Sequence, residues 1–210
     1  MALIVFFLDA NGKKETKISK KITMRKRPFS KKQIQTLRKV LAENPRDLAI
    51  LNTSISTCLR SSDLLNLKVG DVKSKWGEIL GEFEVRMQKT SKTVRCQLSD
   101  DAQDALERWF HVSGKENDDF IFTSVRGGKK PITSVAYRKI IRKWCLECGW
   151  NPEYFSTHSL RRSLPSHLYS QTKDIRSCQL ILGHESPANT ALYLGIEEQN
   201  AFALVKKHQL

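Results

Sequence analysis

Five side chains in three separate segments of the sequence could together bind a phosphate and move protons around it. Arg60 follows an apolar stretch, where an arginine is either paired in the interior or directed into a site. His158 and Arg161 stand at positions i and i+3, which share one face of a helix. His184 stands just before an expected helix start, and Tyr193 follows it by nine residues on that helix. These residue types favour chemistry at phosphorus.

Cleavage of a phosphodiester without a metal needs three kinds of group. A nucleophile attacks phosphorus, cationic donors hold the nonbridging oxygens, and an acid protonates the leaving oxygen. Tyr193 has a suitable hydroxyl, although a phenol with an ordinary pKa of about 10 needs help to lose its proton. Arg60 and Arg161 have the planar fork that binds two oxygens at once, and Asp63 could orient the Arg60 guanidinium. A covalent intermediate would store the bond energy, so that rejoining needs no ATP.

The charge of the chain indicates a polyanionic partner. Its 210 residues include 36 Lys+Arg against 22 Asp+Glu, a formal net charge of +14. Nucleic acid is the commonest partner for such a charge, with a merely basic soluble protein as the alternative. The basic block between residues 9 and 28 is expected to be loop-like and either follows phosphates or is a solvated tail. The expected DNA contacts are Lys13, Lys14, Lys17, Lys20, Lys21, Arg25, Lys26 and Arg27 in this arm, together with Lys92 and Arg162.

Other features of the composition narrow the class of protein. The sequence has no run of about 18 apolar residues, so no membrane span is expected. The apolar start, residues 2–8, is short and reads as a strand or a packed tail rather than a signal peptide. The 5 cysteines are an odd number, typical of reduced thiols in a cytoplasm. Cys145 and Cys148 lack a second pair of ligands nearby, which favours helix packing over zinc, and neither a metal nor a cofactor is expected.

The elements that must position these side chains are mostly α-helical with a small antiparallel β-sheet, an α+β class. Ser30 and Gln33 form a capping box at the start of the first helix. Alternating apolar residues predict two strands joined by a polar hairpin tip. Pro165 should kink the helix that contains Arg161, because proline removes a backbone hydrogen bond. The expected helices span 30–41, 45–59, 62–67, 99–110, 133–148, 157–169, 174–182 and 187–194, and the expected strands span 79–87 and 93–98.

In their order along the chain, these residues resemble the motif of the tyrosine recombinase (phage integrase) family. That motif is an arginine, a hairpin lysine, His-x-x-Arg, Gly-His, and a tyrosine nine residues after that histidine. The segments LRSSDLLNLKVGDV, THSLRRS and LILGHESPANTALYLG look like boxes of the family, and the resemblance covers roughly residues 27–200. It implies the family's catalytic-domain fold over residues 29–196, between a basic arm at 1–28 and a tail at 197–210. The matched catalytic residues are Arg60, Lys89, His158, Arg161, His184 and Tyr193.

The resemblance also implies a role for each matched residue. Tyr193 would form a 3′-phosphotyrosyl link, clamped by the two arginines. Lys89 at the hairpin tip would protonate the leaving 5′-oxygen, with Lys92 as the alternative acid. His158 would exchange a proton with the tyrosine, and His184 would donate a hydrogen bond to a phosphate oxygen.

The implied function is site-specific DNA recombination by integration, excision or inversion. A type IB topoisomerase and a non-catalytic DNA-binding module are the alternatives. Most members carry a further helical domain before the catalytic one, and this chain is similar to short members without it, such as the fimbrial phase-variation recombinases. We expect the basic arm, residues 12–32, to replace that domain in part when double-stranded DNA binds.

The tail, residues 197–210, is expected to dock on a neighbouring protomer, with packing on its own domain as the alternative. Exchange would give a homotetramer on DNA. Accessory DNA-bending proteins are further expected partners, and the expected location is cytoplasmic, at the bacterial nucleoid.

Overall fold

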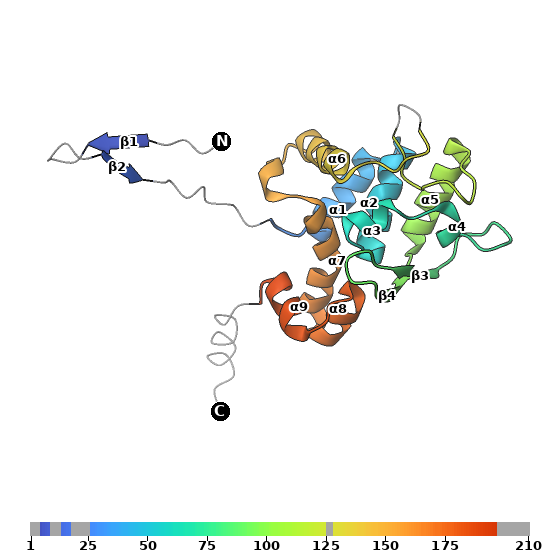
Figure 1. Cartoon of the computed structure of the whole chain (residues 1–210). Coiled ribbons are helices and arrows are strands. Elements are labelled where there is room, and N and C mark those ends of the chain that lie inside the picture. The colour runs from blue at the N-terminus through green and yellow to red at the C-terminus, as the bar shows by residue number, and fades with distance from the viewer. Residues whose placement is uncertain (1–4, 9–13, 18–25, 125–127, 197–210) are drawn as a thin grey trace.

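A computed structural model describes residues 5–8, 14–17, 26–124 and 128–196 of the chain (Figure 1). The two N-terminal segments are the strands β1 (Val5–Leu8) and β2 (Lys14–Lys17), which pair antiparallel. The first strand agrees with one of the two expectations for the apolar start. The second corrects the loop-like expectation at residues 14–17. A lone strand leaves a row of backbone N–H and C=O groups unpaired, and the pairing of β1 with β2 satisfies part of them.

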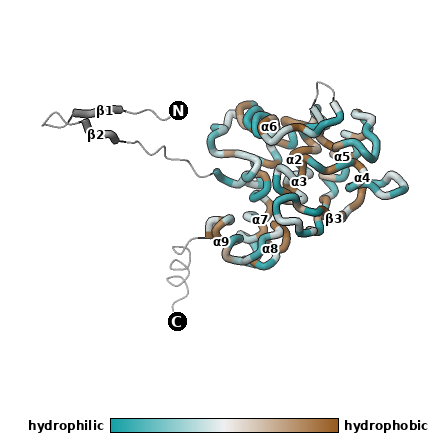
Figure 2. The backbone as a smooth tube through the Cα atoms, in the orientation of Figure 1, coloured by the Kyte–Doolittle hydropathy of each residue, from teal (hydrophilic) through white to brown (hydrophobic). Residues whose placement is uncertain are grey.

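The core of the domain surrounds α2 (Pro45–Thr57). The helix begins where expected because Asn44 caps it, accepting the Asp47 backbone N–H at 3.2 Å, and Pro45 occupies the first turn. Ten of its residues are buried, and it packs against α5 (Asp100–Ser113) and α7 (Thr157–Thr172). Figure 2 shows hydrophobic residues along this inner helix and hydrophilic residues on the outer turns.

The helix α1 (Lys31–Val40) closes one side of this core. Ser30 and Gln33 form the expected capping box, with bonds of 3.0 and 3.3 Å between each backbone N–H and the other side chain. Just before it, Phe29 is 3% exposed, and its ring stacks on Phe155 at a centroid distance of 4.3 Å. Phe29, the first residue of the expected catalytic domain, is therefore part of the core.

Two short helices, α3 (Ser61–Leu65) and α4 (Val69–Val72), lead into the sheet of β3 (Glu82–Arg86) and β4 (Thr93–Gln97). The strands pair antiparallel with Glu82 opposite Gln97, and Phe83 and Cys96 face the core. The hairpin was expected, whereas α4 was not. Its N–H groups find partners far away in sequence, such as Asn117, whose carbonyl accepts the Gly70 N–H at 2.9 Å.

The C-terminal half is helical, as expected. It consists of α6 (Ser134–Glu147), a short 3-10 helix η1 (Pro152–Tyr154), α7, α8 (Ile175–Leu182) and α9 (Pro187–Leu194). Gly183 and Gly195 end the last two helices in the left-handed conformation. α7 continues through Pro165, which is buried. Within the described ranges no helix is long and apolar enough to cross a membrane.

Candidate active site

Arg161 lies at the centre of the site and also connects two helix ends. It is 4% exposed and donates to the carbonyls of Cys58 at 2.5 Å and Leu182 at 2.7 Å. These carbonyls lie at the C-terminal ends of α2 and α8, where no further turn of helix is present to pair them. The cation also lies where two helix dipoles present their negative ends. Arg161 therefore holds two helix ends together and places a positive charge between them.

Arg60 lies near Arg161. It precedes α3 as its N-cap, and its Nη1 atom is 2.9 Å from the Sδ atom of Met87 on the hairpin. Its charge contributes to lowering the pKa of Arg161 and of His184, so the two guanidinium groups share one electrostatic neighbourhood. Two positive charges at close range favour an anion between them.

His184 lies directly against the tyrosine. Its ring meets the Tyr193 ring edge-on at a centroid distance of 5.2 Å, and its Nδ1 atom is 3.1 Å from the Thr190 hydroxyl. Burial, then the charges of Arg161 and Arg60, lower the pKa of His184 to about 4. The imidazole is therefore neutral at pH 7, and it could donate a hydrogen bond to a phosphate oxygen without carrying a charge.

The Tyr193 hydroxyl is buried and lies beside the Arg161 guanidinium, but outside the geometry of a full hydrogen bond. Burial raises the pKa of Tyr193, while the nearby charges of Arg161 and Arg162 act in the opposite direction. A buried hydroxyl without a partner is uncommon, because it gives up its hydration and gains no hydrogen bond in return. Here the hydroxyl lies close to the Arg161 guanidinium, whose Nη1 and Nη2 atoms donate to carbonyls at the ends of α2 and α8.

His158 lies on the open side of the site. The residue is exposed at the first turn of α7, but its ring is partly desolvated. This desolvation, then the charges of Arg161, Arg162 and Arg60, lower its pKa. It lines a cleft of about 660 Å³ together with Ser61, next to Arg60. The cleft is also lined by Lys26, Arg138 and Arg142, and by Glu153, which pairs with Lys26 and Arg142, so its wall keeps a net positive charge.

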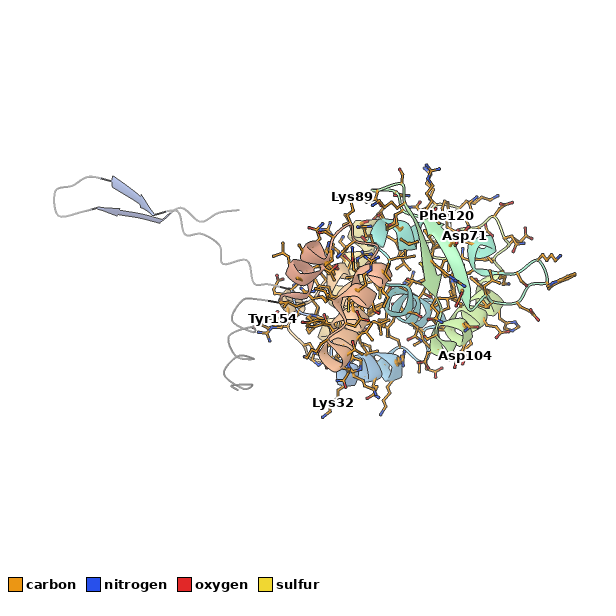
Figure 3. All side chains as sticks on the ribbon, turned by 90° about the horizontal axis from the view of Figure 1, so that it is seen from below. Lys32, Asp71, Lys89, Asp104, Phe120 and Tyr154 are labelled. Atoms are coloured by element: carbon orange, nitrogen blue, oxygen red, sulfur yellow. The ribbon has the colours of Figure 1, made fainter. Side chains whose placement is uncertain are left out.

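The hairpin tip contains both candidate lysines. Lys89 is exposed, lies at the edge of the domain in Figure 3, and makes no hydrogen bond or ion pair with the described residues. Lys92 is instead paired with Glu185, with Nζ and Oε1 3.2 Å apart. Asp63 holds the tip from below, because its Oδ1 atom accepts the Gln88 backbone N–H at 2.9 Å. Within the described residues Asp63 forms no ion pair with Arg60, contrary to the expectation that it orients this guanidinium.

The arm residues are only partly described. Lys14 and Lys17 lie in β2, and Lys26 and Arg27 contact the domain at Glu153 and Tyr154. Arg162 is half-buried and donates to backbone carbonyls, so its expected DNA contact stays a prediction. The remaining expected arm contacts lie outside the described residues: Lys13, Lys20, Lys21 and Arg25.

The structure adds residues that sequence reasoning missed. Met87, Thr190, Arg138 and Arg142 surround the expected site residues. Of these residues, only Arg138 and Arg142 have a sequence signal that could have indicated them, because they lie one helical turn apart before the His-x-x-Arg motif. In the described part of the chain no three His, Cys, Asp or Glu side chains gather as metal ligands.

Arg161 and His184 lie next to a half-buried tyrosine, with Arg60 and His158 in the same electrostatic neighbourhood. On a helical domain with a β-hairpin, this set of groups suits enzymes that form a covalent tyrosine link to phosphate. The chain belongs to the phage integrase family, whose sequence profile matches residues 16–200. It is 34% identical over 167 residues to the probable integrase/recombinase YoeC of Bacillus subtilis, covering 80% of this chain and 87% of that protein. It is also 31% identical over 158 residues to the tyrosine recombinase XerC of Actinobacillus pleuropneumoniae, covering 74% of this chain and 49% of that one.

Solved structures agree on the fold. The crystal structure of XerA recombinase superposes with a TM-score of 0.71 at 23% identity, over 89% of this chain and 66% of that one. The XerH recombinase bound to its difH substrate gives 0.66 at 19% identity, over 94% of this chain and 59% of that one. The expected family and fold are thereby confirmed. This chain spans about half the length of the XerC relative.

Proposed function

We propose that this chain is a site-specific DNA recombinase that cleaves and rejoins DNA through Tyr193. The observation that carries the proposal is that Arg161 and His184 lie next to Tyr193, while the charge of Arg60 acts on both of them. Relatives named as recombinases support the same reaction, since the family match covers all of these residues.

Each group has a step in the reaction. The Tyr193 oxygen forms a bond to phosphorus, the bond from phosphorus to the 5′-oxygen breaks, and the 3′ end stays on the protein. Arg60 and Arg161 neutralise the charge that builds on the nonbridging oxygens. His158 takes the phenolic proton, and Lys89 supplies a proton to the 5′-oxygen. The reverse sequence joins a 5′-hydroxyl to the same phosphate, so bond energy is conserved.

DNA itself is the proposed partner, and the structures of XerH with difH show a similar fold in complex with DNA. The basic cleft beside His158 supports a DNA backbone entering the site from that side. We further propose that the protein forms a homotetramer on DNA, with the tail exchanged between protomers. The proposal also includes accessory DNA-bending proteins and a place at the bacterial nucleoid. The tail, residues 197–210, lies outside the described residues. Sedimentation of the protein with and without this tail on its DNA site tests the assembly.

A library of nicked duplexes of random sequence tests the reaction and finds the DNA site in the same experiment. After incubation, covalent protein–DNA products are trapped by denaturation and their DNA is sequenced. We expect a recurrent sequence from the unaltered protein and no product from Tyr193→Phe. Tyr169→Phe, a variant at another helical tyrosine, is the matched control and should retain the product. Equal products from all three proteins would contradict the proposal.

A further inference from the structure

The helix α9, which contains Tyr193, buries few of its residues. Of the residues in α9, only Thr190 is buried, and Leu192 is 77% exposed. Short helices are marginal unless tertiary contacts stabilise them, and a helix with little apolar burial opens easily. The polar contacts that reach α9 from other elements therefore add to its packing on α7 and α8 in placing the nucleophile.

Arg162 supplies such contacts. Its Nη2 atom donates to the Leu194 carbonyl at 3.3 Å, at the end of α9, and its guanidinium lies 5.4 Å from the centre of the Tyr193 ring. Its Nη1 atom donates to the Lys26 carbonyl at 3.2 Å, where the basic arm enters the domain. We propose that Arg162 is a positioning residue, which fixes the end of α9 and the Tyr193 ring to the root of the arm.

The chemistry of arginine suits this role. A cation near the last carbonyls of a helix satisfies unpaired acceptors and opposes the helix dipole. The same guanidinium can lie over an aromatic face, which a neutral amide would not do as well. Its neighbour Arg161 is directed to Cys58 and Leu182, so consecutive residues of α7 serve two different purposes.

The anchor at Lys26 is itself fixed. The next residue, Arg27, donates its backbone N–H to the Tyr154 carbonyl at 2.8 Å, and its guanidinium lies 4.5 Å from the centre of that ring. The Lys26 ammonium donates to the Glu153 carbonyl at 2.5 Å. A shift of the arm root would therefore reach Leu194 through a single side chain.

Catalytic consequences of this role rest on the proposed function, but the position of Tyr193 can be measured without DNA. The full chain is labelled with 3-fluorotyrosine, and Tyr193→Phe assigns the fluorine signal. Its pH titration gives the pKa of Tyr193, and hydrogen exchange of residues 190–196 gives the opening of α9. Arg162→Met removes the charge and both donors, whereas Arg162→Lys keeps only the charge. Arg108→Met is the matched control, because Arg108 on α5 donates at 3.1 Å to the carbonyl of Ala42, in the turn after α1 and away from α9.

We expect Arg162→Met to accelerate exchange in α9 about tenfold and to raise the pKa of Tyr193, because the variant has neither the cation nor the helix cap. Arg162→Lys should leave the pKa of Tyr193 close to its value in the unaltered protein and still accelerate exchange in α9. A purely structural loss would change both quantities together. The inference would be overturned if Arg162→Met and Arg108→Met showed the same exchange rates in α9 and the same pKa of Tyr193. If Arg162→Met does not fold, unchanged exchange in Arg162→Lys overturns it equally. A protein that shows the expected shifts but forms no covalent DNA product supports this inference and contradicts the proposed function.

Discussion

At the scale of single residues, the site keeps its histidines neutral by burial and by the charges around them. The pKa of His184 falls from 6.5 to about 4, with burial as the largest cause and Arg161 and Arg60 as further causes. The pKa of His158 is lowered by the same kinds of effect. A phosphate bound between the arginines would offset their charge and raise both values, so substrate binding and protonation are coupled.

The depressed pKa of His184 predicts a loss of stability in acid. Between pH 6.5 and about 4 the unfolded chain binds a proton that the folded protein does not bind, so stability falls as the pH is lowered through this window. Urea unfolding at pH 7 and pH 5 measures the loss. We expect His184→Gln to lose less stability than the unaltered protein between these two values. A larger loss in the variant would contradict the assignment.

The two hairpin lysines make different predictions. Lys89 makes no hydrogen bond or ion pair with the described residues, whereas Lys92 is paired with Glu185, which supports Lys89 as the acid. A 5′-bridging phosphorothiolate has a leaving group that needs no proton, because a thiolate is far less basic than an alkoxide. Once a site is known, Lys89→Ala should slow cleavage of normal DNA at least 100-fold, of the order expected for a general acid, and recover on the sulfur substrate. Recovery by Lys92→Ala in its place would reverse the assignment.

At the scale of elements, the hairpin and the turn before α9 fit closely at Gly183. This residue has a φ of +60°, and a methyl group on it would lie 2.8 Å from Val94 Cγ1 and 2.9 Å from Met87 Cε. The same Met87 contacts Arg60, and His184 directly follows Gly183 in the chain. A change at this contact therefore reaches two of the proposed phosphate-binding residues, Arg60 and His184.

Gly183→Ala should both destabilise the domain and misplace the site. The left-handed conformation costs an alanine about 1 kcal/mol, and the clash adds roughly 1–3 kcal/mol. Gly114→Ala is a matched control, because Gly114 has a φ of +61° and nothing within 4 Å of the added methyl group. Urea unfolding should show a larger loss for Gly183→Ala than for Gly114→Ala. Equal losses would mean that the hairpin does not pack tightly on this turn.

The elements themselves were largely predictable, because local signals decide them. The Ser30 capping box and the Pro187 start of the last helix are visible directly in the sequence. α4 escaped prediction because its stability depends on contacts with Asn117 rather than on its own four residues. The pairing of β2 was missed for a related reason, since a strand rich in charge is specified by its partner.

The site was predictable as a set of residues but not as a geometry. The order of Arg60, His158, Arg161, His184 and Tyr193 indicated one family, which the comparison confirmed. Their directions depend on tertiary contacts that no local pattern encodes, such as Asp63 bonding the hairpin backbone instead of Arg60. The inward direction of Arg162 is another case, because adjacent residues of a helix face different surroundings.

At the scale of the whole molecule, we propose the basic arm and the cleft beside His158 as two sources of affinity for DNA. Phe29 is part of the core, so a deletion that tests the arm should end before Lys26 rather than at residue 32. Removal of residues 1–25 should weaken DNA binding. It should also reduce the slope of log affinity against log salt by roughly 0.9 for each phosphate that the arm neutralises.

The matched control for the arm is a charge change in the cleft. Arg138→Gln leaves the arm intact, and it should reduce the slope by roughly 0.9, the value for one phosphate. An arm deletion that leaves both affinity and salt slope unchanged would show that the arm does not touch DNA. Filter binding across a series of salt concentrations measures both quantities.

The central claim is that Tyr193 takes up the 3′ phosphate at a site formed by Arg60, Arg161 and His184. Its most direct test is mass spectrometry of the trapped covalent product after digestion of both protein and DNA. The account predicts one peptide, containing Tyr193, with a nucleotide joined through its 3′ phosphate. A nucleotide on another residue, or one joined through a 5′ phosphate, would contradict it.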